Sequence, residues 1–105
     1  MLVETMPTVS CRYSGELRCV ATHERSGAVL MTDAPIDNAG KGDAFSPTDL
    51  VATALATCML TIMGITARNR GWSIDGSTAE VDKHMSETGP RKVRKLRVEL
   101  RLPQH

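Results

Sequence analysis

The sequence predicts an α+β domain in which the strands of an antiparallel sheet flank one long, buried, central helix. Three observations indicate this class: an uncharged helical segment within residues 46–71, three strand-like runs before it, and a two-stranded hairpin pattern after it. A chain of 105 residues has the length of one domain. We therefore expect one domain over residues 1–105.

The expected strands are short runs rich in β-branched or alternating apolar residues and bounded by turn residues. They cover residues 8–13, 17–23 and 28–32 before the helix, and residues 77–85 and 93–102 after it. A bend or turn is expected at Ser14-Gly15. Residues 37–43 are polar and contain glycine, so they are predicted to form the loop that leads into the helix.

The helix has clear start and stop signals. Ser46 can cap its amino end, Pro47 suits the first helical position, and Asp49 places a negative charge in the first turn. At the other end, Arg68 falls in the last turn and Gly71 follows just beyond it, as is typical of helix termination.

Between Asp49 and Arg68 the helix carries no charge, so it is expected to be buried on nearly all sides. Its usual apolar stripe is predicted to face the core and contains Val51, Ala54, Leu55, Cys58, Ile62 and Ile65. A thiol in this position is either inert packing or a chemical centre. A membrane span is the alternative for such a segment, but its threonines and the soluble strands and turns around it argue against a membrane.

One sheet can cover only one face of this helix, and little else in the chain is left to cover the second face. Large apolar patches rarely stay exposed in soluble proteins. A second copy of the chain is the simplest cover, so we expect a homodimer.

The composition excludes several classes of function. The net charge is +1, and the basic run from Arg91 to Arg101 has no aromatic residue to stack on a base, so no nucleic-acid partner is expected. The three cysteines, Cys11, Cys19 and Cys58, lack metal-binding spacing, and no cofactor or metal is expected. An odd cysteine count and no evident signal peptide predict a cytoplasmic protein with reduced thiols.

Several motifs together resemble the OsmC/Ohr family. They are Tyr13–Arg18, Asp33-Ala34-Pro35, the Gly40-Lys41-Gly42 loop, and the helix SPTDLVATALATCMLTIMG with the basic end and Gly71 after it. The resemblance covers roughly residues 13–102. It implies an intertwined homodimer with two long helices at the centre and sheets wrapped around them.

The resemblance also implies an activity, the reduction of organic hydroperoxides by a cysteine on the central helix in oxidative or osmotic stress defence. That cysteine corresponds to Cys58. The family arginine that favours the thiolate corresponds best to Arg18, and the acidic partner at the helix start corresponds to Asp49, with Thr48 as the other alignment. Nine residues at about 100° each separate Asp49 from Cys58 by roughly 13 Å along the axis and put them on opposite sides of the helix. Asp49 could therefore affect Cys58 only through a break in the helix or by orienting Arg18 across the dimer. Otherwise it serves as charge and cap support at the helix start.

The chain departs from the family pattern at the second, resolving cysteine, because it ends at His105 before any matching segment. Regeneration of Cys58 would then need an external thiol reductant. The alternative is a non-catalytic dimeric binding or structural module of OsmC-like fold with a buried Cys58. An organic rather than inorganic peroxide is favoured by the apolar residues expected near Cys58, which are Leu55, Met59, Ile62 and Met63.

Overall fold

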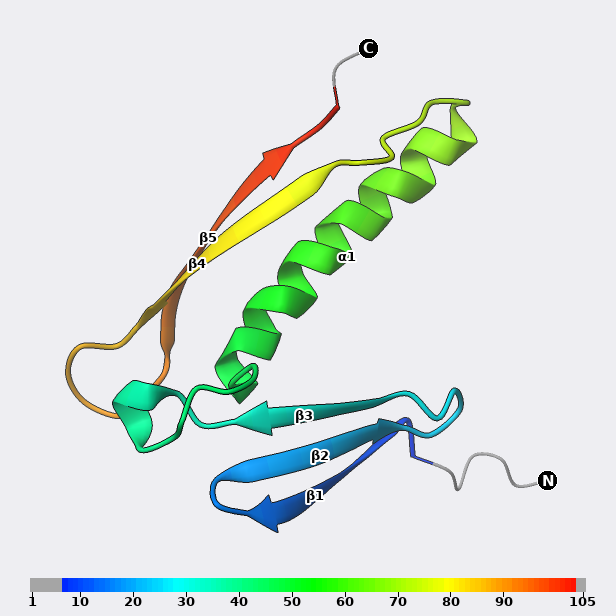
Figure 1. Cartoon of the computed structure of the whole chain (residues 1–105). Helices are drawn as coiled ribbons and strands as arrows, with labels where there is room; N and C mark the ends of the chain where they lie inside the picture. Colours follow the sequence, from blue (N-terminus) through cyan, green and yellow to red (C-terminus); the bar gives the residue numbers. More distant parts are fainter. Residues whose placement is uncertain (1–6, 104–105) are drawn as a thin grey trace. The chain divides into compact units, whose positions relative to one another are not determined.

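The computed structural model describes residues 7–103 and divides into two compact units, with the boundary between Pro47 and Thr48. Residues 1–6, part of the segment where no signal peptide is expected, and residues 104–105 lie outside the described residues. The order of elements is three strands, a short 3-10 turn, one long helix and two strands, drawn in Figure 1. The predicted α+β class, with antiparallel strands and one long helix, is confirmed.

The first unit holds a three-stranded antiparallel sheet in the order β1 (Val9–Gly15), β2 (Arg18–His23), β3 (Val29–Asp33). The hairpin between β1 and β2 turns at Glu16 and Leu17, whose φ angles are 55° and 63°. The prediction of a turn at Ser14-Gly15 was wrong by two residues. Two left-handed residues in succession match the twist of the flanking strands, and neither Glu nor Leu signals such a turn.

The loop from β3 to the helix is tightly folded. It contains the 3-10 turn η2 (Ile36–Asn38), and backbone N–H groups of Asn38 and Gly40 both donate to the carbonyl of Pro35 at 2.9 Å. A Cβ placed on Gly40 would lie 1.7 Å from the carbonyl oxygen of Ala34. Only glycine allows this approach of backbone to backbone, so Gly40 fixes the course of the chain toward the helix.

The helix α1 (Pro47–Asn69) begins and ends where the sequence predicts. Pro47 is its first residue and directly follows Ser46, which is buried. At its end Gly71 has φ 72°, the N–H of Trp72 donates to the carbonyl of Ala67 at 2.8 Å, and the N–H of Gly71 donates to that of Arg68 at 3.1 Å. This pair of bonds around a left-handed glycine is the Schellman arrangement, which satisfies carbonyls at the helix end.

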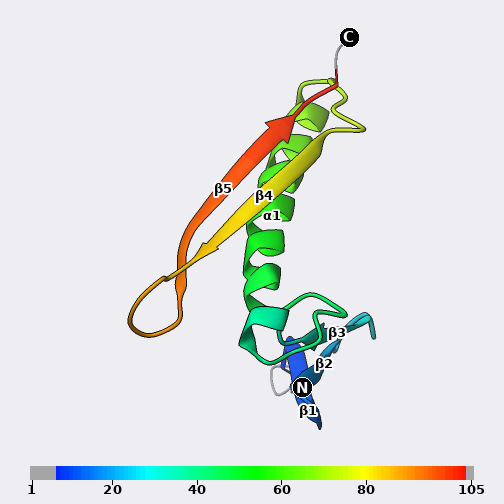
Figure 2. The same ribbon diagram turned by 60° about the vertical axis from the view of Figure 1, so that its left-hand side comes forward.

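The second unit places α1 beside an antiparallel ribbon of β4 (Thr78–Met85) and β5 (Val93–Arg101), as Figures 1 and 2 both show. Along β4, half-buried and exposed residues alternate strictly, so one face of the ribbon is covered and the other faces solvent. The buried apolar residues among the described positions are Ala52, Ala56 and Ala67, all on α1. Their small side chains lie on the half-buried face of the helix.

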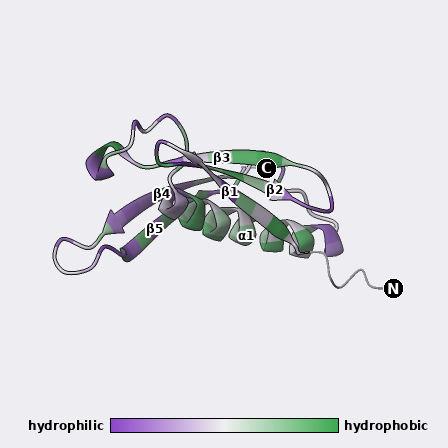
Figure 3. Cartoon of the chain, turned by 90° about the horizontal axis from the view of Figure 1, so that it is seen from below, coloured by the Kyte–Doolittle hydropathy of each residue, from purple (hydrophilic) through white to green (hydrophobic). Residues whose placement is uncertain are grey.

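The prediction that the Val51–Ile65 stripe and Cys58 face the core of the chain was wrong. Val51, Ile62 and Ile65 are each more than half exposed, and Cys58 is exposed as well. A two-stranded ribbon has only one face to offer, and the alanine face of α1 takes it. Figure 3 shows hydrophobic colouring along the helix.

The length and hydropathy of α1 would by themselves suffice to cross a membrane, a test that core helices of soluble proteins also pass. That this chain has no membrane partner stays a prediction.

Candidate functional site

Cys58 lies in the middle of α1, on its exposed face, as a free thiol. It is the one cysteine of residues 48–105, since Cys11 and Cys19 lie on β1 and β2 of the first unit. The side of the helix that carries the thiol is the side that this chain leaves uncovered. Within this chain the thiol is therefore not packed in an apolar interior.

Arg18 is the first residue of β2 and lies directly opposite Asp33, the last residue of β3, in the antiparallel ladder. Its Nη2 atom is 2.6 Å from Oδ2 of Asp43 and 3.6 Å from Oδ2 of Asp33. The guanidinium is thus held by two carboxylates of its own unit. One of them, Asp43, is exposed, whereas Asp33 is 1% exposed.

The loop that carries Asp43 is also hydrogen-bonded to the carboxylate of Asp33. Oδ2 of Asp33 accepts a hydrogen bond from the backbone N–H of Asp43 at 3.0 Å, and the backbone N–H of Asp33 donates to the carbonyl of Phe45 at 3.0 Å. Two atoms in this cluster, Oδ1 of Asp33 and Nε of Arg18, are buried without a hydrogen-bond partner among the described residues.

Asp49 lies in the first turn of α1 and contacts Lys83 of β4. The Nζ atom of Lys83 is 2.8 Å from Oδ1 of Asp49 and donates to Oγ1 of Thr48 at 2.8 Å. The ammonium reaches both candidates for the acidic position, Asp49 and Thr48, and the Lys83 side chain is only 16% exposed. Asp49 is half-buried on the ribbon side of the helix, whereas Cys58 is on the exposed side.

The structure therefore groups the predicted site residues into separate sets. Arg18 lies with Asp33 and Asp43 in the first unit, Asp49 lies with Lys83 in the second, and Cys58 lies on the exposed helix face. Asp43 and Lys83 were not predicted as site residues, and Asp33 only as part of a resembling motif. Their roles depend on strand register and on the helix–ribbon packing, which the spacing of residues does not reveal.

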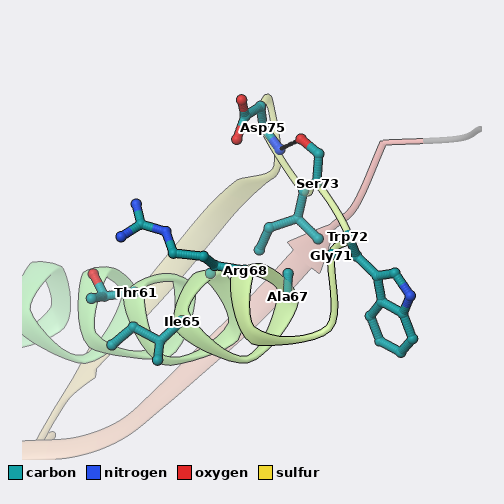
Figure 4. A pocket seen from close by; sticks show the side chains of 10 residues that line it. Thr61, Ile65, Ala67, Arg68, Gly71, Trp72, Ser73 and Asp75 are labelled. Carbon is teal, nitrogen blue, oxygen red and sulfur yellow. Dashed lines mark hydrogen bonds between the residues drawn. The ribbon is translucent and has the colours of Figure 1, made fainter.

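A hollow of 640 Å³ lies at the carboxyl end of α1, away from Cys58. Arg68 and Trp72 lie at opposite ends of it in Figure 4, and the N–H of Asp75 donates to Oγ of Ser73 at 3.2 Å. Its lining mixes charged, polar and apolar side chains and does not include Cys58. No cluster of three His, Cys, Asp or Glu residues that could hold a metal ion occurs within residues 7–103.

Fold and sequence agree on the class of protein. A family model for OsmC-like proteins matches residues 40–104. A crystal structure from Psychrobacter arcticus 273-4, of a protein assigned to the osmotic stress induced and detoxification response, is 48% identical; the match covers 100% of this chain and 76% of that chain with a TM-score of 0.91. A comparison with curated proteins gives no match. The chain belongs to the OsmC-like family.

Proposed function

We propose that the protein is a thiol-dependent peroxidase that reduces organic hydroperoxides through Cys58. The observation that carries this proposal is a free, exposed cysteine in the middle of the long helix of an OsmC-like chain. The relative from Psychrobacter arcticus is assigned to a detoxification response, which fits removal of a toxic peroxide. In this proposal Arg18 favours the thiolate form of Cys58 and Asp49 supports the site from the helix start.

The proposed reaction begins with the Cys58 thiolate, because the thiolate is the nucleophile. Its sulfur attacks the terminal peroxide oxygen and the O–O bond breaks. The leaving alkoxide takes up a proton and departs as an alcohol, while Cys58 becomes a sulfenic acid. An external dithiol then displaces water to form a mixed disulfide, and its second thiol releases the Cys58 thiolate and the oxidised dithiol.

We also propose a homodimer in which a second copy covers the exposed face of α1. This face presents a row of large aliphatic side chains beside Cys58: Val51, Leu55, Ile62 and Ile65. A row of this kind is too apolar to remain in water in a soluble protein. In such a dimer the same side chains form an apolar surrounding for the substrate, which favours organic over inorganic peroxides.

A single-turnover experiment tests the proposed activity. The reduced protein receives one equivalent of cumene hydroperoxide, and a dimedone probe then traps sulfenic acid for peptide mass spectrometry. We expect the label on Cys58 and none in Cys58→Ser. Cys11→Ser and Cys19→Ser serve as controls and should keep the label on Cys58.

The competing function is a non-catalytic dimeric binding or structural module. The observation that favours it is the exposed aliphatic face of α1, which could serve only to hold two chains together. Absence of the dimedone label on Cys58 in a folded, dimeric protein would establish that alternative.

A further inference from the structure

We propose that Asp33 is a positioning residue for Arg18: its buried carboxylate orients the guanidinium directly, across the β2–β3 ladder, and indirectly, through the loop that carries Asp43. This inference rests on the proposed function, in which Arg18 favours the thiolate of Cys58. Asp33 itself makes no contact with a reacting atom in this proposal.

The direct part comes from strand register. Arg18 and Asp33 are paired across the ladder, so their side chains project from the same face of the sheet with Cβ atoms about 5 Å apart. Each also stands at the end of its strand, next to the loop of residues 34–46. The pairing of the two backbones therefore places the carboxylate of Asp33 near the guanidinium of Arg18, whichever rotamers the two side chains adopt.

The indirect part comes from the loop. Oδ2 of Asp33 accepts the backbone N–H of Asp43, and the side chain of Asp43 lies 2.6 Å from Nη2 of Arg18. Gly40 fixes the same loop through its close approach to Ala34. Asp33 thus sets the position of the second carboxylate that holds Arg18.

The burial of Asp33 indicates that its negative charge, and not only its hydrogen-bonding oxygen, is needed at this position. A carboxylate that is 1% exposed is costly to bury unless it is paired, and an asparagine could accept the Asp43 N–H without that cost. The feature that only the aspartate supplies is a negative charge beside Arg18. In Arg18, Nη2 contacts both Asp33 and Asp43, and Nε is buried. Nη1 is therefore the nitrogen of Arg18 that is left to contact a group other than these two carboxylates.

The experiment compares Asp33→Asn with Asp82→Asn. Asp82 and Arg97 form a matched pair, directly opposite each other on β4 and β5 at 3.5 Å, but both side chains are more than half exposed. We expect restricted rotation of the Arg18 guanidinium in nitrogen-15 NMR spectra of the native protein. Asp33→Asn should release that rotation, and Asp82→Asn should leave Arg18 unchanged. An Arg18 spectrum that is the same in Asp33→Asn and the native protein would overturn the inference.

The rate of Cys58 oxidation gives the second readout. Asp33→Asn should lower the second-order rate constant with cumene hydroperoxide by about tenfold or more, because a displaced charge loses its effect on the site. In an Arg18→Ala background the same substitution should have no further effect, whereas independent, additive losses would contradict a positioning role.

The two readouts separate this inference from the proposed function. A native protein that does not form sulfenic acid refutes the peroxidase, while the Arg18 spectrum still decides the role of Asp33. Urea denaturation checks the fold first. If Asp33→Asn is unfolded, Asp43→Asn, at an exposed carboxylate, takes its place in both readouts, with a partial release of Arg18 expected and an unchanged spectrum counting against the inference.

Discussion

The ammonium nitrogen of Lys83 on β4 lies 2.8 Å from Oδ1 of Asp49 in the first turn of α1, so one ion pair joins the ribbon to the start of the helix. The amino end of a helix carries partial positive charge, which favours Asp49 and disfavours Lys83. The lysine side chain is also the more buried partner, at 16% against 44% exposed. The pair is therefore unequal: Lys83 depends on Asp49 more than Asp49 depends on Lys83.

This inequality predicts the stabilities of two variants. Asp49→Asn leaves a poorly solvated ammonium at the positive end of a helix and should lower the free energy of unfolding by about 1–2 kcal/mol. Lys83→Met leaves a partly solvated carboxylate in a favourable place and should cost less than about 1 kcal/mol. Urea denaturation measures both. Arg101→Met, which removes one of two exposed partners of Glu99, is the control and should change stability by less than about 0.5 kcal/mol. Equal losses in the two Lys83–Asp49 variants would refute the argument.

Arg18 should control the reactivity of Cys58 if it favours the thiolate. Arg18→Ala should slow alkylation of Cys58 by iodoacetamide at neutral pH by about tenfold, which corresponds to about 1.4 kcal/mol of lost charge stabilisation. Arg18→Lys keeps the charge and should lose less. Peptide mass spectrometry of the quenched reaction gives the rate for Cys58 alone. Identical rates in native protein and Arg18→Ala would remove Arg18 from the site.

The exposed aliphatic face of α1 predicts assembly. Sedimentation at micromolar concentration should show a species of twice 11.4 kDa. Ile62→Glu puts a charge in the middle of this face and should shift the protein to the monomer, since burying an unpaired carboxylate costs several kcal/mol. Ile36→Glu, at a more exposed isoleucine in the loop, is the matched control and should leave the dimer intact. A native protein that sediments as a monomer would refute the dimer.

The close backbone contact at Gly40 predicts that the loop between β3 and α1 does not tolerate a side chain at this position. Gly40→Ala would place a methyl group 1.7 Å from the carbonyl oxygen of Ala34, so the backbone has to move. The free energy of unfolding should fall by about 1–3 kcal/mol, and the N–H of Asp43 should lose protection from hydrogen exchange as its bond to Asp33 breaks. Lys41→Ala, at the exposed neighbouring position, should change neither quantity. Full protection of the Asp43 N–H in Gly40→Ala would show that the loop tolerates the methyl group.

Local signals were enough to predict the long helix and the five strands. The capping residues, Pro47 and Gly71 determine the two ends of α1 through backbone hydrogen bonds within a few residues, and the prediction was correct at both ends. The strands followed from short-range alternation. The Glu16-Leu17 turn was missed because strand twist, rather than the intrinsic preference of these residues, imposes its left-handed backbone.

The candidate site depends on contacts between distant residues, which local signals do not carry. Arg18 and Asp33 meet because of the β2–β3 register, and Lys83 meets Asp49 across 34 positions of sequence because α1 lies beside β4. Periodicity found the stripe of large aliphatic residues on α1 but wrongly assigned it to the interior of the chain, and it did not identify the face that holds Ala52, Ala56 and Ala67. Small alanines, which contribute little to a hydrophobic pattern, take the face toward the ribbon, and the larger aliphatic residues of the predicted stripe remain outside.

The alanine face of α1 has a thermodynamic consequence. Alanine methyl groups release little free energy on burial, about 0.8 kcal/mol for each carbon group of this size, and three alanines are the buried apolar residues among those described. In the dimer that we propose, the contact with the second chain adds stability to a folded state with so small an interior. By mass action, the temperature of half-unfolding should then rise with the total protein concentration.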